Sequence, residues 1–279
     1  MQSFLVKLPA LLRGDMPKYL ENLPDGIVDL TSNVLSSLRT DMTGSTDYLD
    51  LLSNRQQRIY GDLAAACLNH VVRTPEAAQL LGRLGPNEEA YGLNLAEVDG
   101  AVLRVHFYTG EGSLTPDQAA IMVDNPLDTE KYAPHNHLGH ISGVAQIGKL
   151  VHHCYKEVEG DTYTAGHMIL EEVPDATKEY KVGRSIFVQE RPVGLDLLSH
   201  TEIDDGKGYW MNRQTAHIVT WPKPTVTVFI NDFSERHAST IYQLGDVEGE
   251  LQKVRSLGVD RQRVWDDFTN LVASEGYGG

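Results

Sequence analysis

The spacing of hydrophobic residues changes along the chain. Up to about residue 84, apolar residues recur every three or four positions, as in IVDLTSNVLSSL (Ile27–Leu38) and RIYGDLAAACLNHVV (Arg58–Val72). Such spacing gathers apolar side chains on one face of an amphipathic helix. The tail shows it again, from VEGELQKVRSL to VWDDFTNLVA. We therefore expect helices in both terminal regions.

The middle of the chain has a different texture, with short segments that alternate in polarity or are rich in β-branched residues. Gly, Pro, Asp and Asn separate these segments. The strand-like segments are AVLRVHFYT, AAIMVD, GVAQIG, KLVHHCYKEV, TYTAGHMILEEV, RSIFVQE, AHIVTW and TVTVFIN. About eight short strands at such spacing favour an antiparallel sandwich or barrel over alternating βαβ units.

These changes in pattern predict an α+β protein with three regions. Residues 1–92 form a helical region that packs on a barrel, residues 93–235 form the β-barrel, and residues 236–279 form a C-terminal helical extension. A chain of 279 residues is long enough to bury a substantial core.

Charge and cysteine content narrow the set of partners. The chain has 24 basic and 39 acidic residues, and the resulting charge of -15 opposes binding to nucleic acid or to anionic lipid. No hydrophobic run approaches the length of a membrane span. Its two cysteines, Cys67 and Cys154, are too few for a disulfide framework or a four-cysteine zinc site. We expect a cytoplasmic protein without nucleic-acid or membrane partners. The sequence is compatible with a monomer or a homodimer.

Two of the eleven histidines have a spacing that suits a metal ion. His135 and His137 stand in the segment APHNHLGH. In an extended chain, residues two apart point to the same side, so both imidazoles can reach one point. An additional ligand has to come from another segment. His217 is isolated in AHIVTW just before a turn, and His200 beside Asp204 is its main rival.

The segments PHNHLGHISGVAQIGKLVHHCY and AHIVTWPKPTVTVFI resemble the two motifs of cupin barrels, particularly those of thiol dioxygenases of the cysteine dioxygenase type. The resemblance covers roughly residues 95 to 235. It implies an antiparallel β-barrel, the double-stranded β-helix, in which His135, His137 and His217 hold one metal ion. Thiol dioxygenases carry Ser-x-His-x-Tyr on the strand after the third histidine, whereas this chain has TVFIN at residues 227–231, so a thiol substrate is not implied.

The carboxylate that many cupins place about four residues after the second histidine is missing. Ile141 stands at that position, and no glutamate follows until Glu157. Three neutral imidazoles leave coordination positions open for substrate and oxygen. His140 is expected to act near the metal, by orienting a ligand or contacting substrate, rather than as a fourth ligand.

The resemblance also indicates an arginine that binds a substrate carboxylate upstream of the His-x-His motif, and Arg104 in AVLRVHFYT is its counterpart. The leading hypothesis is a mononuclear non-haem iron oxygenase that uses Fe(II) and O2 on a small polar substrate, such as an amino acid or a related acid. Other divalent metals suit imidazole ligands too. The alternatives are a metal-dependent isomerase, lyase or hydrolase without redox chemistry, and a cupin that binds without catalysis.

Overall fold

The protein is described by a computed structural model. The described residues are 19–20, 22–41, 48–83, 90–109, 134–173, 182–234, 240–244, 253–255 and 261–278.

The helices are amphipathic and bury one face each. In α2, Ser53 caps the first turn and exchanges hydrogen bonds with Gln56, which satisfies backbone groups that a helix start leaves unpaired. Among the described helices, none is long and apolar enough to cross a membrane. The helices are α1 (Asp25–Asp41), α2 (Asn54–Val72), α3 (Ala77–Leu80) and α5 (Arg261–Ser274).

One antiparallel sheet, here called sheet A, has the strand order β1-β8-β5-β10-β4-β3-β2. Its central strand β10 pairs with β4 on one side and β5 on the other. Its strands are β1 (Leu49–Leu51), β2 (Gly82–Arg83), β3 (Ala90–Val98), β4 (Ala101–Tyr108), β5 (His140–Ile147), β8 (Lys207–Met211) and β10 (Thr225–Asp232).

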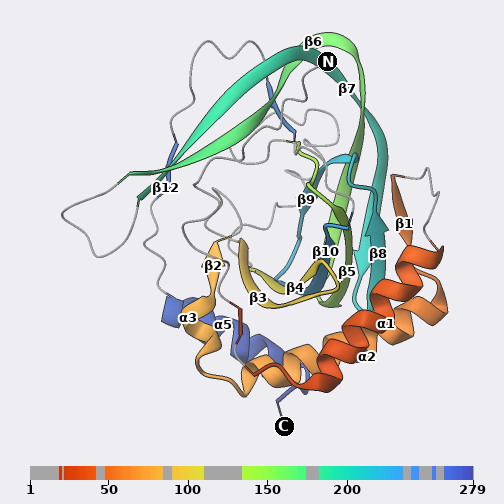
Figure 1. Cartoon of the computed structure of the whole chain (residues 1–279), viewed down its shortest axis with the longest axis vertical. Helices are drawn as coiled ribbons and strands as arrows, with labels where there is room; N and C mark the ends of the chain where they lie inside the picture. The colour runs from red at the N-terminus through yellow and green to blue at the C-terminus, as the bar shows by residue number, and fades with distance from the viewer. Residues whose placement is uncertain are drawn as a thin grey trace.

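The second antiparallel sheet, sheet B, has the order β11-β6-β7-β12, with β9 also paired to β6. Strands β6 and β7 have 25 and 23 residues, and they arch together over the top of the view in Figure 1. Its strands are β6 (Lys149–Val173), β7 (Val182–Asp204), β9 (Ala216–Thr220), β11 (Ile241–Leu244) and β12 (Lys253–Arg255).

The alternation of side chains in sheet A creates two separate cores. Leu103 and Val105 of β4 and Val228 of β10 face the helices and join one apolar cluster. Figure 1 shows α1, α2 and α5 together along that side of the sheet. The neighbouring residues along the same strands, such as Tyr108 and Phe229, join a second cluster with residues of sheet B. The interior between the two sheets is therefore the place where polar residues of β4 and β10 meet β6 and β9.

Antiparallel sheets with flanking helices agree with the predicted α+β class, but three details of the prediction are wrong. The described strands form two sheets and no closed barrel. The N-terminal region is not wholly helical, because β1 pairs with β8. In the tail, residues 253–255 form a strand on β7, since pairing with an available strand edge outweighs local helical spacing. The predicted strand at residues 119–124 lies outside the described residues.

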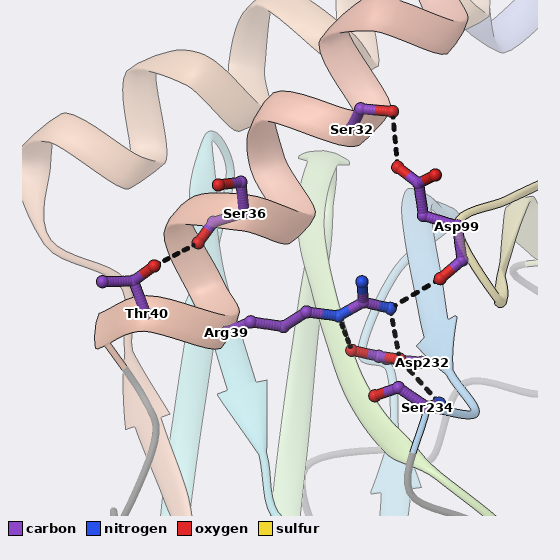
Figure 2. Close-up of polar contacts among 7 residues, drawn as sticks. All are labelled: Ser32, Ser36, Arg39, Thr40, Asp99, Asp232 and Ser234. Atoms are coloured by element: carbon purple, nitrogen blue, oxygen red, sulfur yellow. Dashed lines mark hydrogen bonds and ion pairs between the residues drawn. The ribbon is translucent and has the colours of Figure 1, made fainter.

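A polar contact joins α1 to the C-terminal end of β10. The guanidinium of Arg39 donates from Nε to Asp232 Oδ2 at 2.8 Å and from Nη2 to Asp232 Oδ1 at 2.9 Å. The same Nη2 also donates to the carbonyl oxygen of Asp99, in the turn between β3 and β4 (Figure 2). Ser32, which precedes Arg39 on the same helix, donates to the Asp99 carboxylate. One helix thereby holds two neighbouring points at the same end of sheet A, since Asp232 pairs with Ala101 directly after the turn that contains Asp99.

Candidate metal centre

Backbone pairing brings the PHNH segment to a distant part of the chain. His135 and His217 exchange two backbone hydrogen bonds, of 3.1 and 2.9 Å between nitrogen and oxygen. The Asn136 amide donates to the Thr240 carbonyl, and the His137 amide donates to the Arg213 carbonyl. The segment is thus held between β9, the turn before it, and the start of β11. Besides these main-chain bonds, the Thr240 amide donates to Oδ1 of Asn136 at 2.6 Å.

Three imidazoles converge at this junction. The ligand atoms of His135, His137 and His217 all lie within 4.8 Å of one another. Their ring centroids are separated by 5.1 Å for His135 and His137, by 4.8 Å for His135 and His217, and by 5.0 Å for His137 and His217. The predicted ligand set therefore meets in space, although 80 residues separate its last two members.

The environment favours the neutral form of two of these imidazoles, those of His137 and His217, and the neutral form is the one that binds a metal. Burial, together with the neighbouring histidines, holds the pKa of His137 and of His217 well below the usual value of 6.5. His217 Nδ1 lies 3.3 Å from the carbonyl oxygen of Thr215. If Nδ1 carries the proton and donates there, Nε2 is left with its lone pair directed elsewhere, an arrangement common among metal-binding histidines.

The donor set fits a transition-metal ion. Among the described residues it consists of nitrogen alone, since none of their carboxylates or thiolates joins the three histidines in this group. Three imidazoles suit iron, cobalt, nickel, copper and zinc, whereas magnesium and calcium prefer oxygen ligands. Three protein ligands also leave coordination positions for other molecules.

Polar side chains of sheet A face the same interior. Arg104 and His106 lie on one face of β4, and both contribute to the electrostatic field at His137. The Nε atom of Arg104 and the Nε2 atom of His106 are buried without a hydrogen-bond partner. On β10, Asn231 Oδ1 is buried and unpartnered as well, and the buried Thr227 hydroxyl lies beside Tyr108. Unpaired buried polar atoms are uncommon in folded proteins, and they call for an explanation such as a ligand or water.

The other two histidines weighed from the sequence lie elsewhere. The ring of His140 stacks on Trp210 at 5.2 Å, and Trp210 belongs to the apolar cluster between sheet A and the helices. His140 therefore does not join the three-histidine group, and its effect on turnover stays a prediction. The exposed His200 on β7 contacts His153 on β6. It is likewise not a member of the group.

Sequence reasoning missed His152, which it treated as an ordinary core or surface histidine. Its ring lies 5.7 Å from that of His217 and 4.5 Å from that of Tyr209. The signal was weak but present, because His152 and His153 are consecutive in a strand and must face opposite sides. Only the pairing of β6 with β9 shows which of the two faces the ligands.

No family model matches this chain, and no curated protein matches it in sequence. Several solved structures align with it at low similarity. Hydroxypropylphosphonic acid epoxidase from S. wedmorenis is 12% identical, with a TM-score of 0.29, over 74% of this chain and 96% of the epoxidase. HEPD from Streptomyces albus, with 2-hydroxyethylphosphonate and Fe(II) bound, is 9% identical, with a TM-score of 0.30, over 76% and 43% of the two chains.

The ribosomal oxygenase YcfD of Escherichia coli is 9% identical, with a TM-score of 0.21, over 64% of this chain and 29% of the oxygenase. This chain therefore spans less than half the length of YcfD and of HEPD. TM-scores of this size do not establish a common fold. The chemistry of the site has to follow from its own residues.

Proposed function

We propose that this chain is a mononuclear non-haem iron oxygenase of the cupin type, in which His135, His137 and His217 hold Fe(II). The observation that carries this proposal is the convergence of three imidazoles, within 4.8 Å of one another, in a group that no carboxylate of the described residues joins. Iron bound there supplies open coordination positions and redox chemistry toward O2. The substrate is a small polar molecule, such as an amino acid or a related acid.

The chain's own residues hold and orient this substrate. Arg104 is the residue we assign to an acidic group of the substrate. No carboxylate among the described residues forms an ion pair with it, and burial lowers the pKa of its guanidinium. A buried cation without a counter-ion is costly, so an anionic ligand would offset that cost. The planar guanidinium of arginine can also donate two parallel hydrogen bonds to the two oxygens of a carboxylate.

The rest of the inner wall suits a polar ligand. His106 stacks on Phe229 at 4.6 Å between ring centroids, which fixes its ring plane. Its Nδ1 lies 3.3 Å from the Tyr108 hydroxyl, so Nε2 is the ring nitrogen that remains for another partner. Thr227 and Asn231 add two polar atoms on the adjacent strand. An apolar substrate would leave Nε2 of His106 and Oδ1 of Asn231 unpaired.

The second candidate function uses the same imidazoles without redox chemistry. Three histidines and an open position also suit zinc, which polarises a carbonyl group or activates water. An isomerase, lyase or hydrolase would then be expected. The donor set by itself supports both metals.

Reconstitution with two metals separates these functions. Metal-free protein is loaded anaerobically with ferrous iron or with zinc, candidate amino acids, thiols and related acids are added, and oxygen uptake is followed after oxygen is admitted. We expect uptake that depends on both iron and substrate, because zinc has no accessible redox change. Turnover of the same substrate by the zinc form without oxygen would instead establish the second function. A protein that binds neither metal would contradict both.

A further inference from the structure

His152 occupies a position in sheet B that directs it toward the metal ligands. In the pairing of β6 with β9, Cys154 is opposite His217 and His152 is opposite Val219. Opposed residues of an antiparallel pair lie on the same face, and so do residues two apart on one strand. His152 therefore shares its face with His217. His153, its neighbour, points to the other face and contacts His200.

The imidazole of His152 is buried but makes no hydrogen bond with the part of the chain that the structure describes. The residue is 1% exposed, and both Nδ1 and Nε2 are buried without a partner. Its ring packs on Tyr209 at 4.5 Å between centroids, with an angle of 54° between the planes. It also contributes to the electrostatic environment of both His137 and His217. The side chain is thus held firmly by packing while its polar atoms are left unused.

An ordinary core residue would not be built in this way. Leaving a buried polar atom unpaired costs roughly 1–3 kcal/mol, and an apolar ring of similar size would pack on Tyr209 without that cost. Buried polar groups in folded proteins nearly always have a partner. The partner of His152 has to occupy the interior that it shares with the three ligands.

The distances favour a contact with a bound molecule over direct ligation. The ring of His152 lies 5.7 Å from His217, whereas the three ligand rings lie between 4.8 and 5.1 Å from one another. His152 is also absent from the group whose ligand atoms lie within 4.8 Å of one another. His152 therefore lies next to the three ligands on β6 of sheet B, without being one of them.

We propose that His152 is a catalytic residue that donates a hydrogen bond from its imidazole to an acceptor atom of the molecule held at the open coordination positions. This inference rests on the proposed metal centre and adds to it. Arg104 and His106 approach from sheet A and His152 approaches from sheet B, so the bound molecule would be contacted from two walls. A ligand with polar atoms on two sides is the class that such a site selects.

The experiment uses the full chain loaded with cobalt(II), whose visible spectrum reports coordination, and azide as the probe. Azide is a small anion that binds to open metal positions and accepts hydrogen bonds. Three variants are compared with the wild type. His152→Phe keeps the ring packing on Tyr209 and removes both nitrogens, and His152→Gln keeps a hydrogen-bond donor. His153→Phe is the matched control, because His153 is equally buried and faces the opposite side.

We expect the azide dissociation constant to rise roughly tenfold in His152→Phe, the value of one lost hydrogen bond, and less in His152→Gln. Cobalt affinity, and the spectrum without azide, should stay unchanged in all three variants. Unchanged azide affinity in His152→Phe would overturn the role of His152 while leaving the metal centre intact. Loss of cobalt from His152→Phe and His152→Gln, but not from His153→Phe, would make His152 a ligand and overturn it too. A wild-type chain that takes up no cobalt would contradict the proposed function itself, and the role of His152 with it.

Discussion

His135, His137 and His217 are placed by the backbone before their side chains take part in any chemistry. The reciprocal backbone bonds between His135 and His217 hold the two residues face to face. The alternation of an extended chain then brings His137 to the same side. Since most of the position comes from main-chain pairing, replacing one imidazole should affect metal binding more than folding.

Alanine variants test this separation. His135→Ala, His137→Ala and His217→Ala should each lower bound metal by more than about tenfold, because two imidazoles hold a divalent ion much less well than three. Metal per chain is measured after dialysis, and circular dichroism checks the fold. His200→Ala serves as the control and should retain full metal. Full metal in His217→Ala, with loss in His200→Ala, would mean that the third ligand is wrong.

Arg104 offers a test of substrate class. Arg104→Lys keeps a positive charge but loses the planar fork, so the KM for an acidic substrate should rise about tenfold while kcat changes less. Steady-state kinetics give both values. Arg191→Lys is the matched control, since Arg191 is exposed and already forms an ion pair with Glu157. An unchanged KM in Arg104→Lys would assign Arg104 a structural role.

At the scale of elements, two contacts set how the sheets and helices meet. The Arg39–Asp232 pair attaches α1 to the end of β10, and the Asp232 side chain is only 12% exposed (Figure 2). The carbonyl oxygen of Asp232 also packs so closely on Gly139 that no β-carbon would fit there. The end of β10 thus supports the segment that carries His137.

Removing this pair should destabilise the protein more than removing an exposed pair. Arg39→Ala leaves a largely buried carboxylate without its partner, and we expect the free energy of unfolding to fall by about 1–3 kcal/mol. Urea unfolding gives this value. Lys149→Ala, which removes the pairs with the exposed carboxylates of Glu202 and Asp204, should cost less than about 1 kcal/mol. Equal effects of the two variants would contradict the structural role of Arg39.

Gly148 lies at the corner where the chain passes from β5 in sheet A to β6 in sheet B. Its φ is +95°, and a β-carbon there would lie 2.4 Å from Thr225 Oγ1 and 2.6 Å from the carbonyl oxygen of Pro224. Gly148→Ala should therefore lower the melting temperature, with a cost on the order of 1–3 kcal/mol. Gly61→Ala in α2 has open space and should raise it slightly. A neutral Gly148→Ala would show that this corner adapts easily.

At the scale of the whole molecule, the interior holds several histidines in the neutral form. Burial, with a smaller effect of Arg104, lowers the pKa of His106 to about 3. Burial, with a smaller effect of His200, lowers the pKa of His153 to about 4. In the unfolded chain these groups bind protons near pH 6.5. Below that pH the unfolded state holds more protons, so stability is full above it and is lost as the pH falls.

Each such histidine should contribute about 1.4 kcal/mol per pH unit to the loss of stability of metal-free protein below its unfolded pKa. Urea unfolding between pH 7 and about pH 4.5, in the presence of a chelator, gives the slope. His106→Phe keeps the stacking on Phe229 and removes one titrating group, so its slope should be smaller by about that amount. An identical slope in the variant would show that His106 is already protonated in the folded protein.

Some properties of this protein follow from the sequence alone, because they depend on neighbours along the chain. The three- and four-residue spacing predicted α1 and α2, and alternation predicted β4, β5, β9 and β10. The two-residue spacing of His135 and His137 determined that their imidazoles share a side. The missing carboxylate after His137 favoured a donor set of three histidines over one of histidine and glutamate.

Only the tertiary structure decided which distant residues complete the site. Local spacing sets the face of a side chain within its own strand, but it does not determine which strand lies opposite. The pairing of β6 with β9 placed His152 beside His217, and the opposite face of β5 placed His140 on Trp210. Likewise, residues 253–255 became a strand because β7 offered a partner. These outcomes depend on register and packing between elements far apart in sequence, which no local pattern encodes.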